Sequence, residues 1–88
     1  MADMRAEYLI EQERLILAAT EHIWELLADQ GVPRFELAQS LGMKTRRLDK
    51  LLNGEREMTL RLYAEIVGHL GHRAHITTTP FHERTTTP

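Results

Sequence analysis

Hydrophobic and polar residues follow a helical period over the first thirty positions of the chain. No glycine or proline falls between Arg5 and Gln30, so nothing in that stretch interrupts a helix. The solvent-facing stripe recurs at alternating steps of four and three residues, at Glu7, Glu11, Arg14, Ala18, Glu21 and Glu25. The apolar band on the opposite side contains Leu9, Ile16, Ile23 and Leu27, flanked by Tyr8, Leu15, Ala19 and Leu26. The pattern predicts one long helix, and because its apolar band is wider than a small domain needs, we expect part of it to pack against another molecule.

Two short helices are predicted after this segment. Gly31 stops the long helix, and Pro33 suits the first turn of a second helix over Arg34 to Leu41. Gly42 then supplies a turn before a third helix, from about Thr45 to Asn53. The residues of the third helix that are expected to face inward are Leu48, Leu51 and Leu52.

A fourth helix is predicted beyond a charged loop. The dipeptide Asn53-Gly54 is expected to end the third helix in a left-handed conformation, which both residue types tolerate. Thr59 can cap the fourth helix, and Gly71 closes it. Its apolar face is formed by Leu62, Ile66, Val67 and Leu70. Helices would thus account for residues 5–71.

The C-terminal part of the chain has a different pattern. The segment 72–79 alternates Ala74 and Ile76 with polar neighbours and ends in a threonine run, which predicts an extended strand. Since the sequence contains no second strand, we expect antiparallel pairing with the same segment of another subunit about a two-fold axis. Residues 80–88 offer little to bury and are expected to be loose.

The composition suits one small domain. The chain has 88 residues, 42% of them hydrophobic, which is near the size at which self-association often adds stability. We assign residues 1–71 to an all-α domain with a helical extension at 1–20, followed by the strand at 72–79. The chain has no cysteines, no apolar run approaching about 18 residues and no basic-then-apolar leader, so we expect a cytoplasmic protein that does not enter a membrane.

The formal net charge of −2 conceals an uneven distribution. Residues 1–30 hold seven acids and two bases, residues 31–61 hold four acids and seven bases, and residues 62–88 hold two of each. Positive charge is therefore concentrated over the second and third predicted helices and the loop that follows. Such a local basic excess favours contact with nucleic acid.

Two short helices joined by a glycine turn, with bases where the second one opens, are typical of a helix-turn-helix DNA reader. Further landmarks are Leu26-Leu27, Gly31, Glu36-Leu37-Ala38, Leu41-Gly42-Met43, Leu48, Leu51-Leu52-Asn53-Gly54, Met58-Thr59-Leu60 and Leu70-Gly71. With these landmarks, the chain from about Ile23 to Gly71 resembles the lambda-repressor-like family of bacterial and phage regulators, also called the xenobiotic-response-element or Cro-like family. The resemblance implies a helical domain that binds operator DNA.

The resemblance also implies which positions touch DNA. The base-facing positions of the recognition helix would be Lys44, Thr45, Arg46 and Lys50. The phosphate contacts would come from Arg34, Arg47 and the backbone near Asn53. Side-chain chemistry agrees for Arg46, because a guanidinium fork can donate to both O6 and N7 of guanine.

Lys44 and Arg34 depart from the residues usual in the family, and Asp49 is an acid within the basic helix. Lys44 stands where the family usually has a Ser or Thr cap, and since lysine cannot accept a cap hydrogen bond, Thr45 is the alternative cap. Arg34 replaces a common Gln, so a charge contact with phosphate should raise the salt sensitivity of binding. Asp49 could accept from cytosine N4, repel phosphate or pair with a base of its own helix, and we favour the intrahelical pairing.

The sequence gives less support for a metal site, a ligand pocket or a catalytic site. Histidines that could suggest a metal are His69, His72, His75 and His82. His69 ends a helix, and His72 and His75 lie on opposite faces of the predicted strand, without a carboxylate or thiolate beside them. We therefore expect surface histidines and no metal or cofactor, with a pH-sensitive dimer contact as the alternative. Trp24 and Tyr63 each fit the helical spacing of their own segment, with Leu27 and Leu62 nearby, which favours a packing role over a ligand pocket. No catalytic motif or glycine-rich phosphate loop is present, and we do not expect an enzyme.

These features predict a sequence-specific transcriptional regulator, a dimeric repressor that binds a near-palindromic operator in double-stranded DNA. The expected dimer or partner interface comprises Tyr8, Leu9, Leu15, Ile16, Ala74 and Ile76. One alternative is an antitoxin that represses its own operon and binds a partner toxin through its N-terminal extension, at Met4, Tyr8, Leu9, Ile10, Leu15 and Leu17. Another is a protein-interaction module that no longer binds DNA.

Overall fold

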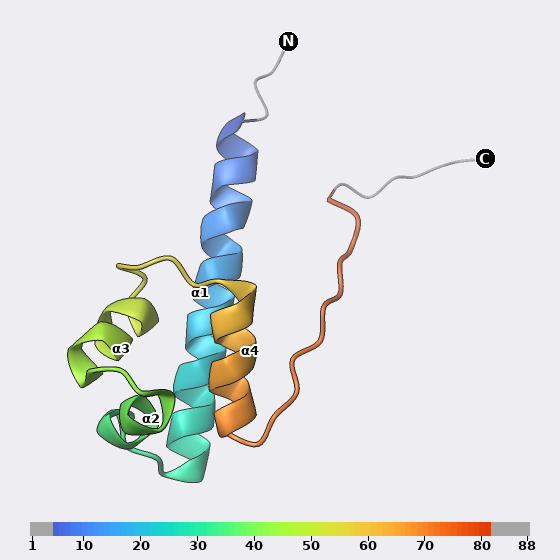
Figure 1. The fold of residues 1–88 in the computed structure, drawn as a ribbon. Coiled ribbons are helices and arrows are strands. Elements are labelled where there is room, and N and C mark those ends of the chain that lie inside the picture. The colour runs from blue at the N-terminus through green and yellow to red at the C-terminus, as the bar shows by residue number, and fades with distance from the viewer. Residues whose placement is uncertain (1–4, 82–88) are drawn as a thin grey trace.

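A computed structural model describes residues 5–81 of the chain, and these form helices with no strand (Figure 1). The helices are α1 (Arg5–Gln30), α2 (Arg34–Leu41), α3 (Thr45–Leu52) and α4 (Leu60–His69). The all-α class and the expected limits of α1 and α2 are therefore confirmed. Residues 1–4 of the predicted N-terminal extension lie outside the described residues, as do residues 82–88, which include His82 and most of the segment predicted to be loose.

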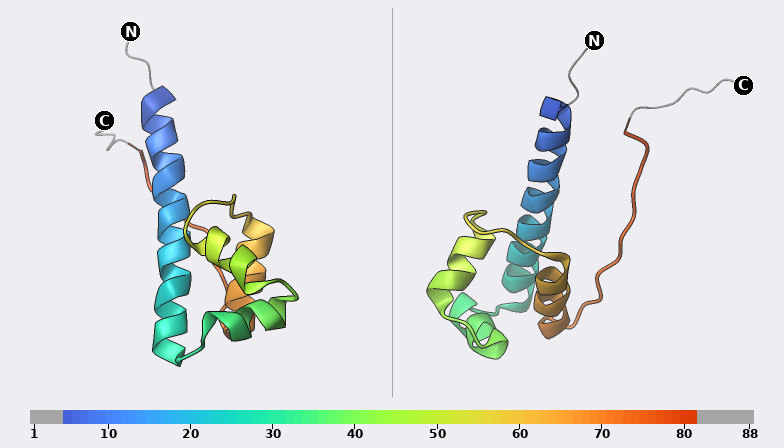
Figure 2. Two further views of the ribbon diagram at one scale, coloured as in Figure 1. Left: turned by 90° about the vertical axis from the view of Figure 1, so that its left-hand side faces the viewer. Right: turned by 45° about the horizontal axis from the view of Figure 1, so that its top comes forward.

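The helices pack around only one half of α1. Figure 1 shows α4 beside the half of α1 that leads to Gln30, with α2 and α3 near the same half, while the N-terminal half extends beyond the other helices. The views in Figure 2 agree with this arrangement. The buried residues of α1 are Thr20, Ile23, Leu26 and Leu27. The apolar band predicted along the whole of α1 is thus buried only at its C-terminal end.

The core is formed by aliphatic side chains from all four described helices. Its buried members are Ile23, Leu26, Leu27, Leu37, Ala38, Leu48, Leu52, Ile66, Val67 and Leu70. Leu48, Leu51 and Leu52 are all buried, which confirms the expected inward face of α3. Tyr63 is partly buried against this core, in keeping with a packing role. The core thereby fixes the positions of α3 and α4 relative to the C-terminal half of α1.

A tight turn joins α2 to α3. Gly42 has a φ of 72°, in the left-handed region that a residue without Cβ adopts at no steric cost. Its amide donates to the Gln39 carbonyl at 3.1 Å, and the Met43 amide donates to the Ala38 carbonyl at 3.0 Å. These two bonds satisfy the last carbonyls of α2 and set the direction in which α3 starts.

The two ends of α3 correct two expectations. Lys44 is the residue that precedes the helix, its side chain makes no cap hydrogen bond, and Thr45 is already helical, so a cap at Thr45 is wrong. At the other end Gly54 has a φ of 78°, but Asn53 has a φ of −96° and is not left-handed. One left-handed residue is enough to close this type of helix end, and glycine adopts that conformation more readily than asparagine.

Helix α4 begins as expected and is followed by an extended segment. The Thr59 hydroxyl oxygen accepts from the Leu62 amide at 3.0 Å, which confirms the predicted cap. Beyond α4, residues 72–81 run back toward the N-terminal end of α1 (Figures 1 and 2), where the rings of Tyr8 and Phe81 lie 6.0 Å apart. The predicted strand at 72–79 is not formed within the described chain, since a ladder needs a second strand. Its pairing across two subunits stays a prediction.

Membrane insertion can be assessed for the same residues. Within residues 5–81, no helix combines the length and the apolar character required to cross a bilayer.

Candidate nucleic-acid interface

Helix α3 has one apolar and one basic side. Leucines at positions 48, 51 and 52 fall on the side that faces the core and are buried. Arg46 and Arg47 are exposed, and Lys50 is half-buried near the end of the same helix. Because the helix repeats every 3.6 residues, this spacing separates the two sides cleanly. The basic side chains are therefore presented to solvent by a helix whose other side is fixed in the core.

An open groove of about 750 Å³ lies between α3, the loop that follows it and the start of α4. The basic side chains that line it are Lys44, Arg46, Arg47, Lys50, Arg56 and Arg61. The acidic ones are Glu57 and Glu65. The excess of bases gives this groove a positive potential, which attracts a polyanion.

Arg56 and Arg61 were not among the predicted site residues. Arg56 lies in the loop between α3 and α4, and Arg61 is the second residue of α4. The signal that could have found them is the basic excess over residues 31–61, which includes both. Their approach to α3 depends on the fold of the loop, which the spacing of residues along the chain does not reveal.

The predicted DNA-contacting residues do not all gather at this groove. Lys44, Arg46, Arg47 and Lys50 line it together. The other predicted residues lie elsewhere: Thr45 half-buried at the start of α3, Asn53 exposed beyond its last turn, and Arg34 at the start of α2.

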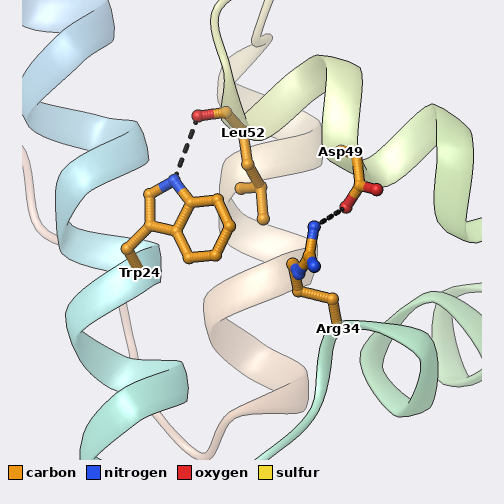
Figure 3. Close-up of polar contacts among 4 residues, drawn as sticks. All are labelled: Trp24, Arg34, Asp49 and Leu52. Atoms are coloured by element: carbon orange, nitrogen blue, oxygen red, sulfur yellow. Dashed lines mark hydrogen bonds and ion pairs between the residues drawn. The ribbon is translucent and has the colours of Figure 1, made fainter.

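Asp49 corrects a further expectation. Its carboxylate forms an ion pair with the Arg34 guanidinium, so the intrahelical pairing that we favoured is wrong (Figure 3). The two residues are fifteen positions apart in the sequence and meet because α2 packs against α3. Both side chains are partly exposed, at 44% for Arg34 and 34% for Asp49.

Trp24 extends this contact to α1. Its indole Nε1–H donates to the carbonyl oxygen of Leu52, the last residue of α3, at 3.2 Å. The guanidinium carbon of Arg34 lies 5.4 Å from the centre of the indole ring, within the range of a cation–π contact. We call these three residues, Trp24, Arg34 and Asp49, the α3 clamp (Figure 3). It connects α1 and α2 to two points of α3.

The predicted dimer or partner residues lie on a separate surface. Exposed side chains among them are Tyr8, Leu9, Leu15, Ala74 and Ile76, while Ile16 is half-buried. Ile10 and Leu17, which belong to the surface expected to contact a toxin, are exposed as well and join Leu9 in a shallow apolar hollow on α1. The first half of α1 thus presents apolar side chains that stay largely exposed, although the Phe81 ring lies against Tyr8.

The histidines are distributed over several elements. Among residues 5–81, no group of three or more histidine, cysteine or carboxylate side chains is arranged to hold a metal ion. His22 of α1 and His72 after α4 have their ring centres 6.5 Å apart, in an edge-to-face arrangement.

No protein-family model, curated protein or solved structure matches the chain.

Proposed function

We propose that the protein is a sequence-specific DNA-binding transcriptional regulator that acts in the cytoplasm as a dimeric repressor. In this proposal α2 and α3 are the helix-turn-helix unit of a lambda-repressor-like domain. The observation that carries the proposal is the basic groove along α3, formed on a helix whose other side is held in the core. A helix of this kind can enter the major groove with its exposed residues toward the bases.

Roles can be assigned to the groove residues by position. We assign base contacts to Lys44, Thr45 and Arg46, which lie at the start of α3, and to Lys50, which follows Arg46 by about one helical turn. Phosphate contacts are assigned to bases at the edges of the groove and to the end of α3, namely Arg47, Asn53, Arg56 and Arg61. No side chain caps the first turn of α3, and the Arg47 amide donates to the Lys44 carbonyl, so the amides of Thr45 and Arg46 are the ones available to a phosphate oxygen.

A dimer would account for two structural features that are left without a partner surface in one described chain. The first half of α1 exposes Leu9, Leu15 and other apolar side chains, and the extended segment 72–79 lacks a strand partner. Two-fold symmetry would place two copies of α3 on successive turns of the duplex, so half-site centres should be about 34 Å apart or a multiple of that distance. A footprint over one unpaired half-site would contradict the dimeric geometry.

The exposed half of α1 also supports a second candidate, an antitoxin. In that case Leu9, Ile10 and Leu17 would contact a toxin, while α3 would bind the operator of the shared operon. Co-expression with the product of the neighbouring gene, followed by purification through a tag on that product, distinguishes the two. A stable complex that a charged substitution at Leu9 disrupts would favour the antitoxin.

The deciding experiment is a binding titration with DNA from upstream of the protein's own gene and with a scrambled duplex of equal length. Each duplex is titrated at several salt concentrations, because phosphate contacts make the logarithm of the binding constant fall linearly with the logarithm of the salt concentration. The proposal predicts tighter binding to the upstream DNA at every concentration. Absence of binding to either duplex at low salt would instead indicate a protein-interaction module.

A further inference from the structure

We propose that Arg34 is a positioning residue for α3, acting through Asp49 and Trp24 rather than by gripping a DNA phosphate itself. This inference rests on the proposed function, since α3 is the helix to which that function assigns base contacts. It replaces the phosphate contact that the resemblance implies for Arg34.

The location of Arg34 is the first observation. It is the first residue of α2, and Pro33 before it provides no side-chain cap. The N-terminal end of a helix carries a positive partial charge, so a cation there is unfavourable for the helix itself. The charge of Arg34 is explained by its partner on α3, not by α2.

The second observation is the effect on Asp49. Asp49 is the acid of α3, a helix whose other charged residues are Arg46, Arg47 and Lys50. Unpaired, its carboxylate would repel DNA phosphates, and it stands three residues after Arg46, a spacing at which the two could pair. Arg34 binds this carboxylate instead. Among residues 5–81, the Arg46 side chain then has no hydrogen bond or ion pair, which leaves its guanidinium available to a base.

The third observation is that Arg34 is itself held in place. The Trp24 ring backs its guanidinium at 5.4 Å, and the same indole donates to the Leu52 carbonyl at 3.2 Å. The clamp therefore touches α3 near its middle, at Asp49, and at its last residue, Leu52. Two fixed points define the direction of a short helix, so the clamp sets how α3 meets the DNA.

The test compares Arg34→Ala, Asp49→Asn and the double variant in DNA titrations over a series of salt concentrations. Arg34→Ala alone should weaken binding and reduce the salt dependence, because it exposes the Asp49 carboxylate to phosphate. In the double variant that carboxylate is neutral, and the salt dependence should return to the wild-type value. If Arg34 instead contacts a phosphate, the double variant will have a slope of log binding constant against log salt concentration that is smaller in magnitude by roughly 0.9, the value for one lost contact. That result would overturn the inference.

Arg14→Ala is the matched control for the loss of one positive charge. Arg14 lies on the solvent-facing stripe of α1, forms an exposed ion pair with Glu11 and does not line the groove. Its substitution should leave both affinity and salt dependence unchanged. A decrease equal to that of Arg34→Ala would mean that any lost charge has the same effect, which contradicts a specific role for Arg34.

A second measurement does not require DNA. In a double-mutant cycle of urea unfolding, followed by the fluorescence of Trp24, the chain's one tryptophan, the Arg34 and Asp49 substitutions should be coupled. The expected coupling is roughly two- to fivefold in the unfolding equilibrium constant, typical of a partly exposed ion pair. Additive effects would show that the pair does not form and would overturn the inference. If the wild type bound no DNA, the proposed function would fail while this cycle still reported on the pair.

Discussion

At the scale of single residues, the basic groove combines side chains with different expected roles. Arg46 can recognise a base because a guanidinium presents two donors in the geometry of the guanine edge. Arg56 and Arg61 lie in the loop and at the start of α4, where they can reach the backbone of DNA but are further from the exposed start of α3. Specificity and overall affinity should therefore depend on different residues.

Arg46→Ala should reduce binding to the operator by about 1–3 kcal/mol and relax the preference at one base pair. Arg61→Ala is the comparison, because it removes a charge from the same groove without changing α3. It should weaken specific and scrambled DNA to a similar extent. Competition titrations with single-base variants of the operator measure both effects. Equal losses on specific and scrambled DNA for Arg46→Ala would refute its base-reading role.

Leu48 anchors the basic helix from the opposite side. It is completely buried in the core, so Leu48→Ala should lower the free energy of unfolding by about 2–5 kcal/mol. Leu60 is 70% exposed at the start of α4, and Leu60→Ala should change stability by less than about 0.5 kcal/mol. Urea unfolding followed by circular dichroism gives both values. Similar losses for the two variants would mean that Leu48 does not carry the packing described for α3.

At the scale of helices, each turn is defined by backbone geometry. Gly42 and Gly68 allow the effect of backbone conformation to be measured without steric clashes. An added Cβ would meet no atom within 4 Å at either position. Gly42 has a φ of 72°, while Gly68 lies within α4. The two glycines thus allow the same substitution to be tested in a left-handed and in a helical conformation.

Gly42→Ala should destabilise the protein by about 1–2 kcal/mol, since an L-residue is strained in the left-handed conformation. Gly68→Ala should stabilise it by about 0.4–1 kcal/mol, because alanine loses less conformational freedom in a helix. Thermal unfolding of both variants measures the difference. Effects of the same sign would contradict the assigned backbone conformations.

The sequence alone predicted the helices better than the contacts between them. Periodic leucines and the glycines at positions 31, 42, 54 and 71 mark the helices, because periodicity and helix ends are local properties. The pairing of Arg34 with Asp49 could not be predicted in this way, since it depends on how α2 crosses α3. For the same reason Arg56 and Arg61 were missed at the groove.

At the scale of the whole molecule, the chain has a compact end and a projecting end. The described residues span 52 Å along their longest axis and 20 Å along their shortest. The core lies where the helices meet, whereas the first half of α1 and the extended segment after α4 lie outside it (Figure 1). Self-association through the projecting parts would leave the basic groove accessible.

If the proposed dimer forms through the projecting half of α1, a charge introduced there should disrupt it. Leu15 is 62% exposed on the apolar side, and Leu15→Glu should lower the fraction of dimer and weaken operator binding. Ala18 is exposed on the solvent-facing stripe, and Ala18→Glu adds the same charge without altering the apolar side. Sedimentation velocity at several protein concentrations compares the two. An unchanged dimer in Leu15→Glu would exclude this face as the interface.

The projecting half of α1 also bears on how long the protein persists in a cell. Residues 5–19 include no buried side chain, and a helix without tertiary burial is only marginally stable in water. Such a segment opens often, and proteases cleave chains that open locally. If the proposed association covers the segment, the unassociated chain should be degraded faster than the complex. The cellular level of the protein would then follow the supply of whatever binds α1.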